Sequence, residues 1–125
     1  MLRFYYVIII SLPLIVYYIF LCTYYYNHQE KYDEYDCYKL AQKIIKTLKR
    51  NAKINTVSYG EQHLPNEGGY IMYSNHQGKY DALGIMSVHK KPCSIIMDAE
   101  KSRVILANQF VNLVKGIRLD KNNFK

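Results

Sequence analysis

His76 and Asp81 are the residues of this chain whose types and spacing could carry acid–base chemistry. They lie five positions apart, with Gly78 between them, where an apolar run ends and a helix-like run begins. A strand-to-helix turn of this length can bring an imidazole and a carboxylate together, so that the histidine acts as a base. The same pair occurs by chance in many proteins, so the surrounding elements must support the prediction.

Short strands and helices are predicted to alternate on both sides of this turn. Residues 70–73 form an apolar run typical of a strand, and residues 81–89 can form the helix that follows. The pattern also predicts a helix at residues 101–114 and strands at residues 54–59, 94–97 and 117–119. Strands that alternate with helices indicate a mixed α/β sheet.

The N-terminal run from residue 5 to residue 26 contains no charged residue. About 20 apolar residues cross a bilayer as a helix, and tyrosines at both ends of the run suit the headgroup regions. A signal peptide, which would be shorter and end in small residues, and a buried core helix are the alternatives. We therefore expect a single-pass membrane anchor at residues 1–27. Lysines and arginines are far more frequent after the run than before it, so the rest of the chain should face the cytoplasm.

Residues 28–53 combine a short acidic juncture with a basic amphipathic helix. From Asp36 onward, apolar residues recur at steps of three and four, while lysines and one arginine occupy the other side. Such a helix beside a membrane anchor suggests contact with anionic phospholipid. A solvated face on an ordinary surface helix explains the pattern equally well. Nucleic acid is not an expected partner, because basic and aromatic residues are not interleaved in the way that stacks bases.

Composition limits the remaining possibilities. The 125 residues have room for one domain besides the N-terminal run, and the net charge of +7 favours an anionic partner. Cys22, Cys37 and Cys93 show no obvious disulfide pairing, so all three are expected to be thiols in a reducing compartment. Cys93 is expected to be a small buried residue rather than a nucleophile. The histidines other than His76 are expected to face solvent, and their spacing predicts no metal site.

Two stretches of the chain resemble the 1-acylglycerol-3-phosphate acyltransferase family, the lysophospholipid acyltransferases. The first is Gly60-Glu61-Gln62-His63-Leu64-Pro65, then Gly68-Gly69, then Ser74-Asn75-His76-Gln77-Gly78-Lys79-Tyr80-Asp81. Its Leu-Pro turn, short strand and Ser-Asn-His-x4-Asp are similar to the family's first block. The second is Gly116-Ile117-Arg118-Leu119-Asp120-Lys121-Asn122-Asn123, which resembles the block whose basic residue helps to hold the acceptor's phosphate. The resemblance covers about residues 54–123, and N-terminal membrane helices are frequent in this family.

Two features depart from the family pattern. Lys121 stands where the second block usually has arginine, and lysine binds phosphate as a point charge without a bidentate fork. Arg118, in the same strand, could supply the fork instead. The family's third block, an acidic residue followed by Gly-Thr-Arg, and its later proline-containing block do not occur before Lys125. We therefore expect residues 54–125 to be an incomplete acyltransferase domain, the N-terminal portion of a longer one.

The resemblance implies acyl transfer from acyl-CoA or acyl carrier protein to the free hydroxyl of lysophosphatidate, with no bound cofactor. His76 would remove the hydroxyl proton, and Asp81 would hold the imidazole tautomer and stabilise the imidazolium. The residues expected to bind substrate are Arg118, Lys121, Lys101 and Asn75. A charged surface for Lys101 and a helix cap for Asn75 stay open as alternatives.

Two other functions are compatible with the sequence. The first is a catalytically inactive, membrane-bound chain that binds anionic lipid or a partner through its basic helix. The second is a plain membrane-anchored structural protein, which would leave two ordered blocks unexplained.

Overall fold

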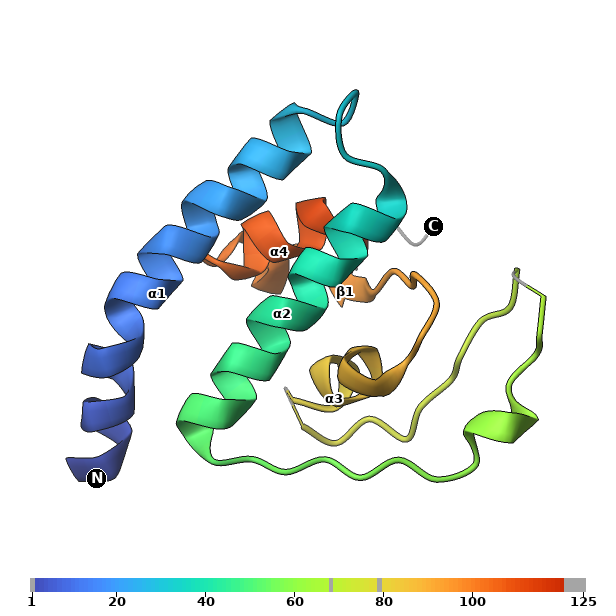
Figure 1. Cartoon of the computed structure of the whole chain (residues 1–125), viewed down its shortest axis with the longest axis horizontal. Coiled ribbons are helices and arrows are strands. Elements are labelled where there is room, and N and C mark those ends of the chain that lie inside the picture. The colour runs from blue at the N-terminus through green and yellow to red at the C-terminus, as the bar shows by residue number, and fades with distance from the viewer. Residues whose placement is uncertain (1, 68, 79, 121–125) are drawn as a thin grey trace.

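Two long helices, α1 (Leu2–Asn27) and α2 (Glu34–Ala52), form a hairpin on which the shorter elements pack. The structure is a computed structural model that describes residues 2–67, 69–78 and 80–120. Figure 1 shows α1 and α2 converging at their connection, with α4 (Ala107–Leu113) packed between them and α3 (Asp81–Val88) against α2. The remaining elements are the 3₁₀ turns η1 (Glu61–His63) and η2 (Lys101–Arg103) and the strands β1 (Ile96–Asp98) and β2 (Ile117–Leu119).

The bounds of α2 follow from its terminal residues. The side chain of Asp33 caps the helix by accepting from the backbone N–H of Asp36 at 2.8 Å. Lys49 and Arg50 lie in the last turn, where cations interact favourably with the helix dipole. Lys53 then adopts a left-handed conformation and ends the helix. The predicted amphipathic helix is confirmed, with a start two residues earlier than expected.

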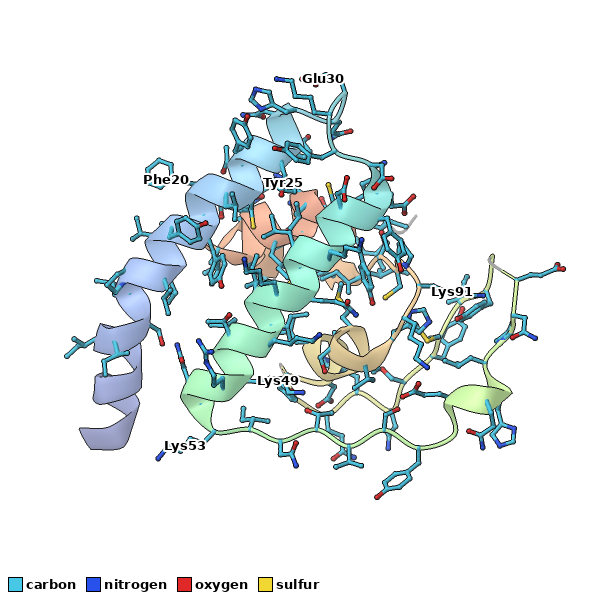
Figure 2. The ribbon with its side chains drawn as sticks, viewed as in Figure 1. Phe20, Tyr25, Glu30, Lys49, Lys53 and Lys91 are labelled. Carbon is cyan, nitrogen blue, oxygen red and sulfur yellow. The ribbon has the colours of Figure 1, made fainter. Side chains whose placement is uncertain are left out.

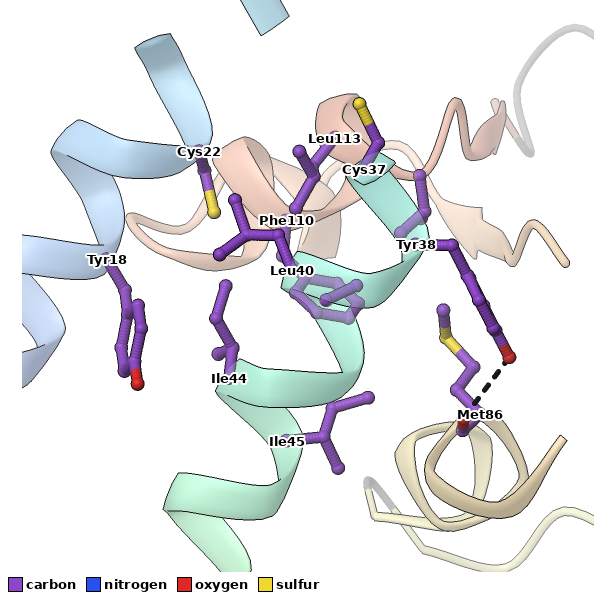
Figure 3. Packing of buried hydrophobic residues seen from close by; sticks show 12 residues of the cluster. Tyr18, Cys22, Cys37, Tyr38, Leu40, Ile44, Ile45, Met86, Phe110 and Leu113 are labelled. Carbon is purple, nitrogen blue, oxygen red and sulfur yellow. Dashed lines mark hydrogen bonds between the residues drawn. The ribbon is translucent and has the colours of Figure 1, made fainter. Parts of the chain in front are cut away.

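The hydrophobic core lies along the apolar side of α2. Ile44 and Ile45 are each only 1% exposed, and they pack with residues of α1, α3 and α4, including Met86 and Phe110 (Figure 3). The hydroxyl of Tyr38 donates to the carbonyl of Met86 at 3.2 Å, which ties α2 to α3. Burying side chains of this size is the main stabilising contribution to such a fold.

β1 and β2 form a two-stranded parallel sheet in which Ile96 pairs with Ile117. The segment between them contains η2 and α4, so a helical connection joins the parallel strands. A Cβ on Gly116 would lie 2.7 Å from Cγ1 of Val111 and 3.1 Å from the carbonyl of Ile95, so only glycine fits where β2 begins. The predicted mixed α/β fold is confirmed, and β2 has the bounds expected from its sequence pattern.

Two of the predicted strands are wrong. Residues 54–59 and 70–73 are extended but pair with no strand in the part of the chain that the structure describes. They belong to the long connection from α2 to α3, which follows the outside of the molecule (Figure 1). Val57 is 62% exposed and Tyr73 is 92% exposed. The alternating pattern is therefore present without the neighbouring strand that would cover it.

The single helix predicted for residues 101–114 is also wrong. It is divided into η2 and α4 because Leu106 between them has a φ of 73°, which no helix accommodates. The backbone N–H of Leu106 donates to the side-chain oxygen of Gln109 at 2.8 Å, and this bond starts α4.

The predicted N-terminal helix is confirmed as α1, and its span Ile9–Asn27 is long and apolar enough to cross a membrane. Signal sequences and buried core helices satisfy the same criterion. One stripe of α1, which includes Tyr18 and Cys22, is buried against the other helices. The opposite face exposes apolar side chains, and Phe20, 71% exposed, points away from the rest of the molecule (Figure 2).

Candidate active site

The turn that precedes α3 brings His76 and Asp81 together. Nδ1 of His76 lies 3.2 Å from Oδ2 of Asp81. The side chain of His76 is 60% exposed and that of Asp81 is 36% exposed, so the pair lies open at the surface. An imidazole that donates from Nδ1 to a carboxylate keeps its lone pair on Nε2. This geometry allows His76 to accept a proton from a group that approaches from outside.

Asp81 is held by the backbone of the same turn. Its Oδ2 accepts from the N–H groups of Gln77 and Gly78, each at 2.8 Å. The backbone N–H of Asp81 in turn donates to the carbonyl of Gly78 at 3.2 Å. Asp81 is also the first residue of α3, where the helix dipole favours a negative charge. The carboxylate therefore closes the turn and faces the imidazole at the same time.

The turn keeps this carboxyl ionised. The backbone N–H of Gly78, followed by that of Gln77, holds the pKa of Asp81 below its usual range, and the neighbouring imidazole acts in the same direction. Desolvation opposes the effect without reversing it. Asp81 can thus stabilise an imidazolium at neutral pH, whereas it is itself too weak a base to take a proton from an alcohol.

The lowered pKa of Asp81 predicts how acid should affect stability. Because the folded-state pKa lies below the unfolded value of about 3.9, the ionised carboxylate stabilises the fold above that pH. The stabilisation is lost as the pH falls through the folded-state pKa. In urea unfolding, the free-energy difference between the wild type and Asp81→Asn is expected to persist at neutral pH and to shrink below about pH 4. A difference that does not change with pH would mean that the carboxylate charge has no part in holding the turn.

Hydrogen bonds from distant residues hold the long connection that leads into this turn. The hydroxyls of Tyr80 and Thr56 lie 2.8 Å apart, which ties the N-terminus of α3 to the start of the connection. Farther along, Nε2 of His89 lies 2.8 Å from the hydroxyl of Tyr70, and Nδ1 of His89 donates to the carbonyl of Lys91 at 2.7 Å. His89 is only 6% exposed, so the expectation that it faces solvent was wrong.

Arg118, on β2, is held by side chains that the sequence did not indicate. Its Nε donates to Oγ of Ser102 at 3.0 Å, and Nη2 donates to Oδ1 of Asn108 at 2.9 Å and to Oδ1 of Asn112 at 2.6 Å. Nη1 is left without a partner among the described residues. The spacing of Asn108 and Asn112, one helical turn apart, is the signal that could have revealed this cluster.

The other predicted substrate-binding residues occupy different places. Asn75 is exposed beside His76, and Lys101 is exposed in η2. Asn75 does not cap α3, because the capping position belongs to Tyr80. Lys121 lies outside the described residues. Across the described ranges, no hydrogen bond or ion pair joins the His76 turn to Arg118 or Lys101, so the predicted site has two parts that are not directly bonded to each other.

Cys93 has the properties of a structural residue. It is partly buried, and its sulfur lies 3.3 Å from the hydroxyl of Tyr38. Burial raises the pKa of the Cys93 thiol, although the hydrogen bond with Tyr38 acts in the opposite direction. A protonated thiol is a poor nucleophile, so Cys93 is not suited to carry an acyl group.

Comparison with known proteins identifies the family. A family model described as Acyltransferase matches residues 55–125, which is more than half of the chain. The chain belongs to this family. No curated protein and no solved structure matches it. The matched residues of this acyltransferase include the His76 turn, η2, α4 and β2, so both parts of the candidate site lie within the family domain.

Proposed function

We propose that this acyltransferase transfers an acyl group from acyl-CoA or acyl carrier protein to the free hydroxyl of lysophosphatidate. The proposal is carried by the 3.2 Å contact between His76 and Asp81 in an exposed turn of an acyltransferase domain. An alcohol is a poor nucleophile at neutral pH, and a neutral imidazole oriented by a carboxylate is the arrangement that activates it.

In the proposed reaction, Nε2 of His76 takes the proton of the acceptor hydroxyl as its oxygen attacks the thioester carbonyl carbon. The new C–O bond forms and the C–S bond then breaks. The departing thiolate takes the proton from the imidazolium, so a free thiol and phosphatidate leave and the imidazole is neutral again. Asp81 stabilises the imidazolium between these two steps. The substrate's own hydroxyl is the nucleophile, so no acyl-enzyme forms.

We assign substrate binding to Arg118, Lys121, Lys101 and Asn75. Nη1 of Arg118 is available to a phosphate oxygen, since the hydrogen bonds of its Nε and Nη2 fix the guanidinium in place. The net charge of +7 also favours phosphorylated substrates over neutral ones.

The membrane is the proposed location of this reaction. α1 exposes an apolar face, and lysophosphatidate is a membrane lipid, so anchoring through α1 would hold the acyltransferase domain at the membrane that contains its substrate. Because basic residues follow α1 far more often than they precede it, the acyltransferase domain is assigned to the cytoplasmic side.

A comparison of two acceptors tests the proposed function. Purified protein is given an acyl thioester with either lysophosphatidate or monoacylglycerol, which has no phosphate, while released thiol and acylated lipid are both measured. We expect thiol release to require an acceptor and to be at least about tenfold faster with lysophosphatidate. The reason is that one hydrogen-bonded contact between a phosphate and a cation changes binding by about tenfold. Equal rates with the two acceptors would contradict the assignment of lysophosphatidate. Binding to vesicles without any acyl transfer would instead support an inactive, lipid-binding chain.

A further inference from the structure

A groove between α1 and α2, which we call the cationic groove, lies apart from the candidate active site. Its volume is about 620 Å³. The walls come from the hairpin helices, whereas His76 and Asp81 lie in the turn before α3, which packs against α2 (Figure 1). Its lining includes Leu14 and Tyr18 on α1 and Lys39, Lys43, Lys46 and Arg50 on α2.

One wall of the groove carries positive charge, and none of the described residues that line the groove is acidic. The four basic residues recur at steps of four, three and four, so they form a single stripe along α2. All four are exposed. The ammonium of Lys39 lies 4.6 Å from the centre of the Tyr35 ring, and Lys43, Lys46 and Arg50 have no side-chain partner among the described residues. Like charges held this close favour an anion beside them.

The other wall is apolar, and a contact between two hydroxyl groups joins the walls. The hydroxyl of Tyr18 lies 3.0 Å from Oγ1 of Thr47, and both residues line the groove, so this contact joins its two helices. Leu14 continues the wall, and beyond it the outer face of α1 exposes Ile9 and Phe20, each 71% exposed. An occupant that matches both walls has a negative headgroup and apolar chains. A free phosphate or a nucleic acid would satisfy only the cationic side.

We propose that the cationic groove binds the phosphate of an anionic membrane phospholipid, whose acyl chains lie along Leu14 inside the groove, while the outer face of α1 contacts the bulk lipid. The lipid is a bound partner in this proposal and not the acyl acceptor. The proposal rests on the proposed placement of α1 in a membrane, but it does not depend on acyl transfer.

The packing of the hairpin fixes the depth of this contact. The bond between Tyr18 and Thr47 places Lys43, Lys46 and Arg50 level with the middle of the apolar run of α1. Charged side chains are costly at the centre of a bilayer, whereas headgroup phosphates attract them. While α1 packs on α2, the groove therefore lies at headgroup depth, and a single-pass arrangement requires α1 to separate from α2.

Single tryptophans can locate the lipid, because the chain contains none of its own. Leu14→Trp places the fluorophore in the groove, and Phe20→Trp places it on the exposed face of α1 as the matched control (Figure 2). Each protein is bound to mixed vesicles of phosphatidylglycerol and phosphatidylcholine in which only one of the two lipids has brominated acyl chains, which quench tryptophan on contact. We expect brominated phosphatidylglycerol to quench the Leu14→Trp protein more than brominated phosphatidylcholine does. The Phe20→Trp protein should show no preference.

Equal quenching of Leu14→Trp by the two lipids would overturn the groove while leaving the anchor in place. Absence of quenching in both proteins would overturn the anchor and the groove together. If inorganic phosphate abolishes the preference at constant ionic strength, the groove is a site for free phosphate and the lipid proposal is wrong. Acyl transfer is assayed separately with detergent-dispersed substrates, so none of these outcomes can be mistaken for a failure of catalysis.

Removing charge from the groove provides a second measurement that does not depend on the introduced tryptophans. Lys43→Gln/Lys46→Gln is expected to weaken binding to phosphatidylglycerol vesicles by about thirtyfold, the usual effect of two basic residues at an anionic surface. Lys90→Gln/Arg103→Gln removes the same charge at exposed positions outside the groove and should cost less than about threefold. Equal losses in the two double variants would show that only net charge matters, and this result would overturn the groove.

Discussion

Replacing His76 with alanine is expected to lower the rate of lysophosphatidate acylation by about a hundred- to ten-thousand-fold. The imidazole is the group at the turn that can take the hydroxyl proton, because the lowered pKa of Asp81 makes that carboxylate too weak a base. The side chain of His76 is 60% exposed, so its removal leaves no cavity and the fold should keep its stability. The measurement is release of free thiol from an acyl thioester in the presence of lysophosphatidate, with urea unfolding as the test of stability.

His63→Ala is the matched control for this variant. His63 is exposed in η1, within the same long connection, and has no contact with Asp81. It should therefore retain the wild-type rate. If His76→Ala keeps more than about a tenth of the wild-type rate, His76 is not the base. An equal loss in both variants would point instead to a change in the connection itself.

The long elements of this fold could be predicted because their signals are local and repeated. α2 has a capping Asp33, an apolar stripe and basic residues in its last turn, and each of these features can be read without knowledge of the rest of the molecule. α1 is apolar on every side, so its existence was clear from composition. Composition does not show which face packs, and the burial of Tyr18 and Cys22 against neighbouring helices emerged only from the structure.

The missing strands show the limit of a local pattern. Residues 54–59 alternate apolar and polar side chains as a half-buried strand would, yet a strand also needs a partner for its backbone. The only ladder in the described ranges joins β1 to β2, and the exposed backbone of the connection has no neighbour of this kind. Leu106 is a second feature that the local pattern does not predict. A leucine with a φ of 73° is rare, and the neighbouring residues give no signal that the helix is broken there.

The candidate site was predictable to a similar extent. The contact between His76 and Asp81 follows from the length of one turn, and the backbone groups that hold Asp81 belong to that same turn. Arg118 was named from the sequence, but its partners on η2 and α4 come together only because the helix is broken at Leu106. Burial of His89 depends on Tyr70, nineteen positions away, and such a contact leaves no periodic signal.

Asp81→Asn is expected to lower kcat by about a hundredfold or more, but by no more than His76→Ala does. An amide at this position carries no negative charge to stabilise the imidazolium. The contacts of Gln77, Gly78 and His76 all fall on the single oxygen Oδ2, which the amide oxygen of asparagine can replace, so the loss of charge is the main change. Because Asp81 acts through His76 and does not touch the acceptor in the proposed reaction, the KM for lysophosphatidate should stay close to that of the wild type. Initial rates at several acceptor concentrations separate the two constants.

The double variant His76→Ala/Asp81→Asn decides whether Asp81 works through the histidine. If Asp81 only orients and stabilises the imidazole, its replacement has nothing further to remove once the imidazole is gone, and the double variant should match His76→Ala within about threefold. If Asp81 mainly builds the turn, its loss would displace the backbone of Gln77 and Gly78 and lower the residual rate again. Additive losses, accompanied by a raised KM, would therefore assign Asp81 to the architecture of the acceptor site and remove it from the proton transfer.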